Sequence, residues 1–271
     1  MLHTIRHQTV FNFETTPQSA VQRLHLMPLT SANQRVLNWE IELIGGTVEL
    51  VTDDFHGNRI HLCRHDAQSN IMQISCWGTV EVEDACGVVG EHDRSLPLGL
   101  FRNETPLSKA GARLRRLARE IVSFRRRNDC GDVELMHKLS ALVRENNRYV
   151  KGRTNVETTA EKAMELGVGV CQDHVHAFTS VARVLGYSAR YVSGYLMVNE
   201  EHVQEASHAW AEVYLSGLGW VGFDISNVIS PDDRYVKLAI GFDYSDVIPV
   251  SGVRYGNGDE RISTEIIFDQ Q

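Results

Sequence analysis

The spacing of apolar residues changes near residue 97, and this change restricts the chain to folds with two kinds of layer. Before it, short runs alternate apolar and polar residues, and turn residues such as Gly45-Gly46 and Gly57-Asn58 separate the runs. Such alternation is typical of strands that bury one face. We expect strands at 21–27, 36–43, 47–51, 58–63 and 71–82. An antiparallel β-sandwich fits this pattern, because each of two sheets can then bury one face.

After residue 98 the apolar residues recur at helical spacing. One set runs from Ala110 to Phe124 and a second from Leu135 to Tyr149. A shorter helix is expected over 158–166, and a fourth from Cys171 to a stop at Gly186. Strand-like runs follow at 189–198, 208–215 and 219–224. Helices followed by an antiparallel sheet predict an α+β unit behind the sandwich.

Composition excludes several classes of partner. The chain has 27 Lys and Arg against 35 Asp and Glu, a formal net charge of -8, which argues against nucleic-acid binding. An arginine cluster at 113–127 is interpreted as the solvated face of a helix. No apolar run approaches the roughly 18 residues of a membrane span, and the first residues lack a signal-peptide pattern. Five scattered cysteines do not form a disulfide framework, so we expect a reduced, cytoplasmic protein.

Cys171 is the candidate nucleophile. It stands at the predicted start of a helix, where free N–H groups and the positive end of the helix dipole favour a thiolate. The thiolate is the form of cysteine that attacks carbonyl carbon. Gly167 and Gly169 would let the backbone approach a substrate, and the N–H of Cys171 could help to bind an oxyanion.

His208 and Asp224 are the candidate partners of that cysteine. His208 follows a polar loop at 199–207 and begins a strand in which Trp210 shares its face. Asp224 ends the next strand, so antiparallel pairing through the turn at 216–219 would place its carboxylate near His208. A slip of one residue would turn that carboxylate to the other face. In the expected register, next to His208, the Asp224 carboxylate would fix the orientation and tautomer of the imidazole.

Four sequence blocks carry a resemblance to a known family. They read GVCQDH at 169–174, GYSARYVSG at 186–194, SHAWAEV at 207–213 and GWVGFD at 219–224. In this order they resemble the transglutaminase-like superfamily. More closely, the chain is similar to bacterial transglutaminase-like cysteine proteases that carry an N-terminal β domain. The resemblance covers nearly the whole chain and includes a tail from Tyr235 to Val253.

The resemblance implies residues 1–100 as an N-terminal β-sandwich domain and residues 101–271 as a papain-like, transglutaminase-like catalytic domain. Its Cys–His–Asp triad falls on Cys171, His208 and Asp224, the same three residues reached above. The chain departs from the family where Ile225 replaces a common proline. Glu165, a poor donor at neutral pH, stands where papain has its oxyanion-hole glutamine. The second oxyanion donor stays open, with Gln172 and the region of Tyr149 as candidates.

Other residues near the blocks have weaker interpretations. Trp210 and Gln172 are candidate substrate contacts, although Trp210 also suits a cleft wall. Asp173 and His174 are expected to support the site or to cap the helix. No metal or other cofactor is predicted, and the chain lacks the acidic loop that calcium dependence would need.

The N-terminal half contains one possible set of zinc ligands. His61, Cys63 and His65 share one face of a predicted strand, and Cys76 could add a fourth ligand. The spacing is not a standard zinc signature. A polar sheet face is therefore the preferred interpretation.

The sequence therefore predicts a cysteine-dependent amide-bond hydrolase that acts on a peptide or protein amide through an acyl-thioester. A transglutaminase, which transfers the acyl group to an amine, is the nearest alternative, because both reactions use the same triad. A non-catalytic binding module with the same fold is the third. Neither a nucleic acid nor a membrane is expected as a partner, and the oligomeric state stays open.

Overall fold

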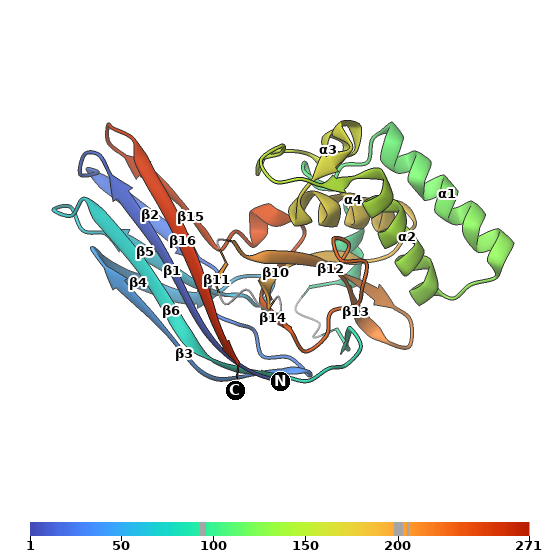
Figure 1. Ribbon diagram of the computed structural model, residues 1–271, viewed down its shortest axis with the longest axis horizontal. Coiled ribbons are helices and arrows are strands. Elements are labelled where there is room, and N and C mark those ends of the chain that lie inside the picture. The colour runs from blue at the N-terminus through green and yellow to red at the C-terminus, as the bar shows by residue number, and fades with distance from the viewer. Residues whose placement is uncertain (93–95, 198–202, 205, 271) are drawn as a thin grey trace.

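The structure is a computed structural model and describes residues 1–92, 96–197, 203–204 and 206–270. A β-sandwich lies beside an α+β unit (Figure 1). This confirms the predicted fold class. Most of the polar loop expected at 199–207, and residue 198 of the strand before it, lie outside the described residues.

The sandwich consists of two antiparallel sheets. One has the order β11-β16-β1-β6-β3, formed by Val203–Gln204, Glu260–Gln270, Leu2–Phe13, Ile71–Val82 and Gln34–Ile44. The other has the order β15-β2-β5-β4, formed by Val250–Tyr255, Ser19–Leu24, Arg59–His65 and Gly46–Asp53. Burial alternates along β6, where Met72, Ile74 and Cys76 are fully buried between the sheets. The alternation in the sequence therefore becomes the sandwich core.

The C-terminal tail belongs to the sandwich. β15 pairs with β2, and β16 pairs with β1 from His3↔Gln270 to Phe13↔Glu260. The expected division into residues 1–100 and 101–271 therefore needs a correction, because residues 250–270 complete the N-terminal sheets. Alternation locates a strand in the sequence but does not identify its partner, so the sequence could not place this tail.

The α+β unit has four helices over one sheet. The helices are α1 (Ala112–Asn128), α2 (Asp132–Asn146), α3 (Ala160–Leu166) and α4 (Cys171–Val184). The sheet order is β14-β10-β12-β13-β7, formed by Tyr235–Gly241, Ala189–Leu196, His208–Leu215, Gly219–Phe223 and Val88–Gly90. Short elements complete it: η1 (Leu98–Arg102), β8 (Arg148–Tyr149), β9 (Val168–Gly169) and η2 (Tyr244–Asp246). The predicted helices and strands are all present, except that the second helix ends before Tyr149.

The two faces of β12 differ as its sequence predicts. Ala209, Ala211 and Val213 pack in the core beneath the helices. Trp210 packs on the other side of the sheet in a separate cluster that includes Tyr235. This alternation fixes the orientation of the strand and places His208 at its first position.

Two buried amide side chains join the sandwich to the sheet. The Asn58 side chain donates to the carbonyl oxygen of Ile240 and accepts from its N–H, both at 2.8 Å. The Gln34 side chain makes the same pair of bonds to Lys237, at 2.8 and 2.7 Å. Each amide therefore pairs with the backbone N–H and C=O of one β14 residue, as a residue of a neighbouring strand would. The sandwich is therefore held in a defined position against the α+β unit.

The cysteines and the helices can be compared with what the sequence predicted about disulfides and membrane spans. All five cysteines are unpaired, so the structure contains no disulfide among them. Within the described residues, no helix is long and apolar enough to cross a membrane.

Candidate active site

Cys171 is the first residue of α4, and the backbone before it is held on both sides. β8 and β9 form a short parallel ladder in which Tyr149 lies opposite Gly169. The Asp173 carboxylate accepts from the N–H of Val170 at 2.8 Å and so caps the helix start. Gly169 packs so closely on Asp173 that an added Cβ would lie 2.7 Å from the Asp173 Cβ. These contacts fix the position of Cys171.

Asp173 has the supporting place that the sequence predicted. Its side chain is buried and also accepts a hydrogen bond from Thr154 Oγ1 at 2.7 Å. Burial raises the pKa of Asp173, although these hydrogen bonds oppose the shift. The carboxyl holds the helix start and is oriented towards the backbone.

The β12–β13 hairpin brings His208 and Asp224 together. Its register pairs Ala211 with Phe223, so Asp224 follows beside the first residues of β12. His208 Nε2 donates to Asp224 Oδ2 at 2.7 Å. The same imidazole also interacts with Cys171, and this interaction helps to raise the pKa of His208. The structure therefore brings the three predicted residues into one chain of contacts.

His208 holds its proton unusually strongly in this setting. Burial alone would lower the pKa of His208, but the hydrogen bonds to Asp224 and Cys171 and their negative charges raise it to about 10. The imidazole is therefore protonated at neutral pH.

Donors surround the Asp224 carboxylate, which is fully buried. Tyr235 Oη and Asn227 Nδ2 each donate to Oδ2 at 2.7 Å, and the N–H of Asn227 donates to Oδ1 at 3.2 Å. Burial disfavours the ionised form, yet the hydrogen bonds from His208, Tyr235 and Asn227 keep the pKa of Asp224 below its usual value. Asp224 therefore stays ionised and orients the imidazole.

Tyr235 and Asn227 were not found from the sequence. Asn227 had a usable signal, because an Asx turn places a side-chain acceptor within reach of backbone donors two or three residues later. Tyr235 had no local signal, since it comes from β14, which is separated from Asp224 by β10 and β12 in the sheet.

The turn after Asp224 is closed by backbone hydrogen bonds. Asp224 and Ile229 exchange two backbone hydrogen bonds at 2.8 and 3.2 Å, and Ile225 is fully buried. Within the turn, Val228 has a φ of 57°. A β-branched residue in this region is strained, so the hydrogen bonds of the turn hold Val228 in an unfavourable conformation.

His174 also has a supporting place. Its Nε2 contacts the carbonyl oxygen of Asn147 at 3.0 Å, and its Nδ1 contacts Ser226 Oγ at 2.8 Å. Since a carbonyl only accepts, Nε2 carries the proton. Burial lowers the pKa of His174 to about 4, so the ring is neutral. His174 thus ties α4 to the turn that holds Asp224.

The expected substrate contact by Trp210 needs a correction. Its side chain is 2% exposed and packs edge-on against Tyr235, with ring centroids 5.4 Å apart. The indole also lies 6.5 Å from the imidazole of His208, centroid to centroid. Enclosed in this way, Trp210 supports His208 and Tyr235 and does not meet a substrate.

Gln172 and Glu165 occupy different surroundings. Gln172 is partly exposed beside Cys171, and its amide donates to the carbonyl oxygen of Val156 at 3.4 Å. Glu165 is exposed on α3 and pairs with Lys162 at 3.0 Å. Glu165 is therefore paired with a neighbouring side chain on the surface of α3.

The residues weighed as a zinc site form part of the sandwich interior. Cys63 and His65 are buried, and His61 is partly buried on the same face of β5. This face of β5 is therefore polar in composition but buried inside the sandwich. Burial raises the pKa of Cys63 to about 11 and that of Cys76 to about 12, so both stay protonated thiols. Among the described residues, no group of three His, Cys, Asp or Glu could hold a metal.

Comparison with known proteins gives two family matches. Residues 115–225 match the model of the transglutaminase-like superfamily, and residues 3–81 match the bacterial transglutaminase-like N-terminal region. The two matched segments lie in the α+β unit and the sandwich, respectively. They confirm the resemblance on which the sequence interpretation rests.

Individual proteins are also similar to parts of this chain. An uncharacterized protein of Mycobacterium leprae is 36% identical over 115 residues, which cover 41% of this chain and 40% of that protein. An uncharacterized protein of Mycobacterium tuberculosis is 31% identical over 140 residues, which cover 48% of this chain and 45% of that protein. The chain thus spans less than half the length of these curated relatives.

One solved structure has the same fold over the whole chain. It is a proposed cysteine protease from Cytophaga hutchinsonii, with a TM-score of 0.76 and 19% sequence identity, and the match covers 100% of this chain and 91% of that chain. At this identity the similarity shows the fold alone.

Proposed function

We propose that this chain, whose core belongs to the transglutaminase-like superfamily, is a cysteine-dependent amide-bond hydrolase. Its substrate is a peptide or protein amide. The observation that carries the proposal is the chain of contacts from Asp224 through His208 to Cys171 at the start of α4.

The proposed reaction has two steps. The Cys171 sulfur attacks the amide carbonyl carbon, and the His208 imidazolium gives its proton to the leaving amine as the C–N bond breaks. An acyl-thioester remains on Cys171. His208, now neutral, takes a proton from water as the water attacks the thioester, which releases the acid and restores the thiolate. An amine in place of water would complete transamidation instead.

The pKa of His208 sets the upper pH limit of the proposed activity. We expect kcat/KM to fall as the pH rises through about 10, because His208 then loses the proton that the leaving amine needs. A histidine at its ordinary pKa would give this loss near pH 6.5. The measurement is kcat/KM between pH 6 and 11. A fall in kcat/KM centred near pH 7 would contradict the assignment of His208 as an imidazolium with a raised pKa.

Unfolding needs separate control in that experiment. Because folding raises the pKa of His208, its contribution to stability is complete below about pH 6.5 and is lost as the pH rises through about 10. Thermal melting at each pH identifies any loss of activity that comes from unfolding.

Tyr149 is the proposed second oxyanion donor. Its position opposite Gly169 places it two residues from Cys171 along the paired strands, and its side chain is 40% exposed. Burial, together with the charges of Cys171 and Asp224, raises the pKa of Tyr149 to about 12. The hydroxyl therefore keeps its proton at neutral pH and can donate to a developing oxyanion.

Removing that hydroxyl tests the role. Tyr149→Phe is expected to lower kcat by about ten- to a hundredfold with little change in KM, because the lost bond forms mainly in the transition state. Tyr214→Phe on β12 is the matched control and should keep full kcat. Equal kcat in Tyr149→Phe and wild type would exclude Tyr149 as a donor.

The overall proposal is tested with a pool of glutamine-containing peptides. Wild type and Cys171→Ala are incubated with the pool, with and without a primary amine, and the products are identified by mass spectrometry. We expect cleaved or deamidated peptides that require Cys171. Amine adducts dominating at modest amine concentration would replace the hydrolase by a transglutaminase. Products that do not depend on Cys171, or none at all, would favour the binding module.

The cytoplasmic location stays a prediction. Five unpaired cysteines are compatible with a reducing compartment. Fractionation of the producing cells would test it.

A further inference from the structure

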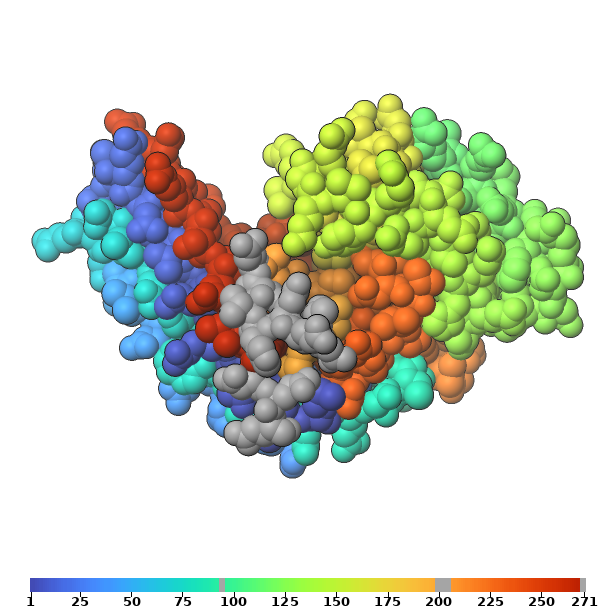
Figure 2. All heavy atoms as spheres, viewed as in Figure 1, coloured from blue at the N-terminus to red at the C-terminus, as the bar shows by residue number. Residues whose placement is uncertain are grey.

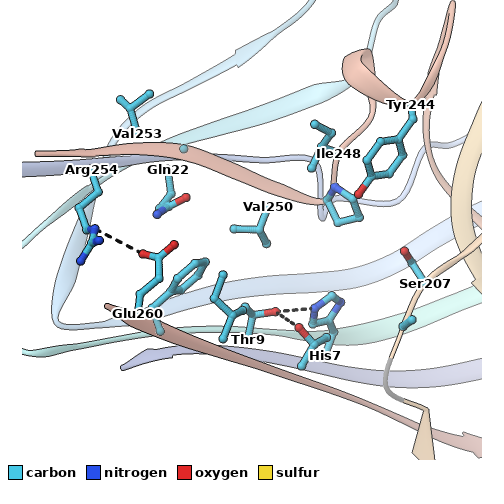
Figure 3. Close-up of a pocket in the computed structure, with 16 residues that line it drawn as sticks. His7, Thr9, Gln22, Ser207, Tyr244, Ile248, Val250, Val253, Arg254 and Glu260 are labelled. Carbon is cyan, nitrogen blue, oxygen red and sulfur yellow. Dashed lines mark hydrogen bonds and ion pairs between the residues drawn. The ribbon is translucent and has the colours of Figure 1, made fainter. Parts of the chain in front are cut away.

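A hollow separates the upper part of the sandwich from the helices of the α+β unit (Figure 2). A cleft also lies between the two sheets of the sandwich, lined by residues of both. The cleft has a volume of about 360 Å³. Inward-facing residues of β1, β2, β15 and β16 line it (Figure 3). A drug-sized ligand or a short peptide fits a cavity of this size.

The lining of the cleft is unusually polar for the inside of a sandwich. Inward positions of packed sheets are normally apolar. Here His7 Nε2 contacts Thr9 Oγ1 at 3.0 Å, and Thr9 Oγ1 contacts Thr264 Oγ1 at 3.2 Å. Val250 and Ile262 supply apolar surface beside this row. Uncharged polar groups next to apolar surface suit a peptide, whose amides need hydrogen bonds and whose side chains need contact area.

Gln22 is the residue that most directly points to a ligand. Its side chain is 5% exposed and projects into the cleft (Figure 3). No hydrogen bond joins its amide to any other described residue. The amide lies at the wall of the open cleft, where water or a ligand can reach it. A ligand that offers both a donor and an acceptor, as a peptide group does, would satisfy it.

Strand edges flank the cleft. β15 is the edge strand of its sheet, with β2 as its neighbour. β16 pairs with β11 at Ile266 and Ile267, and among the described residues no strand covers the same edge between Glu260 and Glu265. Unpaired backbone N–H and C=O groups along an edge can accept an added strand.

One end of the cleft lies near the candidate active site. Ser207, which immediately precedes His208, and Tyr244 lie at one end of it (Figure 3). The N–H of Tyr244 donates at 3.2 Å to His176, on the same helix as Cys171.

The other end of the cleft carries charge. There Arg254 and Glu260 form an ion pair at 3.6 Å, beside the connection between β15 and β16. From Val250 to Arg254 the strand advances four residues, or about 13 Å. An extended peptide covers that length with about four residues.

We infer that this cleft binds an extended peptide segment of about four residues from the substrate and adds it as a strand at the edge of the sandwich. The inference rests on the proposed function, because the reacting amide must lie at Cys171. It assigns the N-terminal sandwich a direct part in selecting substrates. Gln22 and the Thr9–Thr264 pair bind the segment, and Arg254 and Glu260 limit its far end.

Alkylation of Cys171 by probes of increasing length tests this inference. The probes are iodoacetamide and chloroacetylated peptides of one to six residues with degenerate sequence, with the reactive group on either end. Second-order rate constants are measured on the full chain by mass spectrometry, and Cys171→Ala gives the background. The quantity compared is the peptide rate divided by the iodoacetamide rate.

We expect this ratio to rise at least tenfold with length in one of the two series and to level off near four residues. N-methylation of the peptide amides should remove the gain, because it blocks strand pairing. Gln22→Leu should lower the gain about fivefold, as loss of roughly one hydrogen bond predicts, and Thr264→Val should lower it in the same direction. Gln8→Leu is the matched control, since Gln8 lies on the opposite face of β1.

A ratio independent of length, or an equal effect of Gln22→Leu and Gln8→Leu, would overturn the inference. The iodoacetamide rates report separately on the proposed function. If Cys171 reacts no faster than the exposed Cys86, the activated nucleophile is excluded, whatever the peptides show.

Discussion

Replacing Cys171 with alanine is expected to lower amide turnover by a factor of at least about 10⁴. The variant keeps the helix start, the imidazole and Asp224, but it has no atom that can form the acyl-thioester. In enzymes that use such triads, loss of the nucleophile leaves only the rate supplied by binding and the oxyanion hole. Steady-state kcat on a peptide from the positive pool, measured for both proteins, checks the prediction.

Cys86→Ala is the control for that comparison. Cys86 is exposed and its side chain has no place in the site, so its loss should leave kcat unchanged. A Cys171→Ala protein that retains more than about a tenth of the wild-type kcat would exclude covalent catalysis by this thiol.

Replacing Asp224 with asparagine is expected to lower kcat by about 10³. The groups around the carboxylate all donate hydrogen bonds to it. Oδ2 accepts from His208, Tyr235 and Asn227, and Oδ1 accepts from the Asn227 N–H, so every neighbour is a donor. The NH₂ group of asparagine would meet a donor in either orientation. The imidazole would then lose its orientation and part of the charge that raises its pKa.

The same variant should change the pH profile. With Asp224→Asn the upper limit of kcat/KM should move from about 10 towards lower pH, because the negative charge that favours the imidazolium is gone. Asp232→Asn is a matched control, since Asp232 is partly exposed and pairs with Arg234 at 2.6 Å. A folded Asp224→Asn protein with a kcat within tenfold of wild type would show that the carboxylate is not required.

The sequence predicted the candidate triad because each residue stands at an element boundary with a local signal. Cys171 starts a helix with clear periodicity, and His208 starts an alternating strand. Asp224 follows a short hairpin, and in a hairpin the turn sets the register. Local rules were therefore sufficient to bring His208 and Asp224 together.

Local sequence rules could not predict which strands pair when they lie far apart in the sequence. The tail at 250–270 returns to β1 and β2 across more than 200 residues, and nothing in its alternation names these partners. Tyr235 reaches Asp224 for the same kind of reason, since strand order in a sheet is not sequence order. The substrate cleft depends on this tail, so it too could not be predicted.

The remaining differences between the sequence predictions and the structure concern which side chains are buried. The alternation in the sequence assigned four residues to the correct faces of their strands: Trp210 on β12, and His61, Cys63 and His65 on β5. It did not show which layer covers each face. The sandwich packs against one face of the sheet in the α+β unit, and the sandwich sheet that contains β1 and β6 covers the inner face of β5. A polar or amphipathic residue on such a face becomes core only once the partner layer is known.

The most direct test of the central claim is the rate at which iodoacetamide modifies each cysteine at pH 5.5. Exposure alone predicts that Cys86 reacts first, because Cys171 is half-buried and the other three are buried. Activation by His208 predicts that Cys171 reacts first by a wide margin and loses this advantage in His208→Gln. Reaction in order of exposure, with Cys86 ahead of Cys171, would contradict the proposed nucleophile.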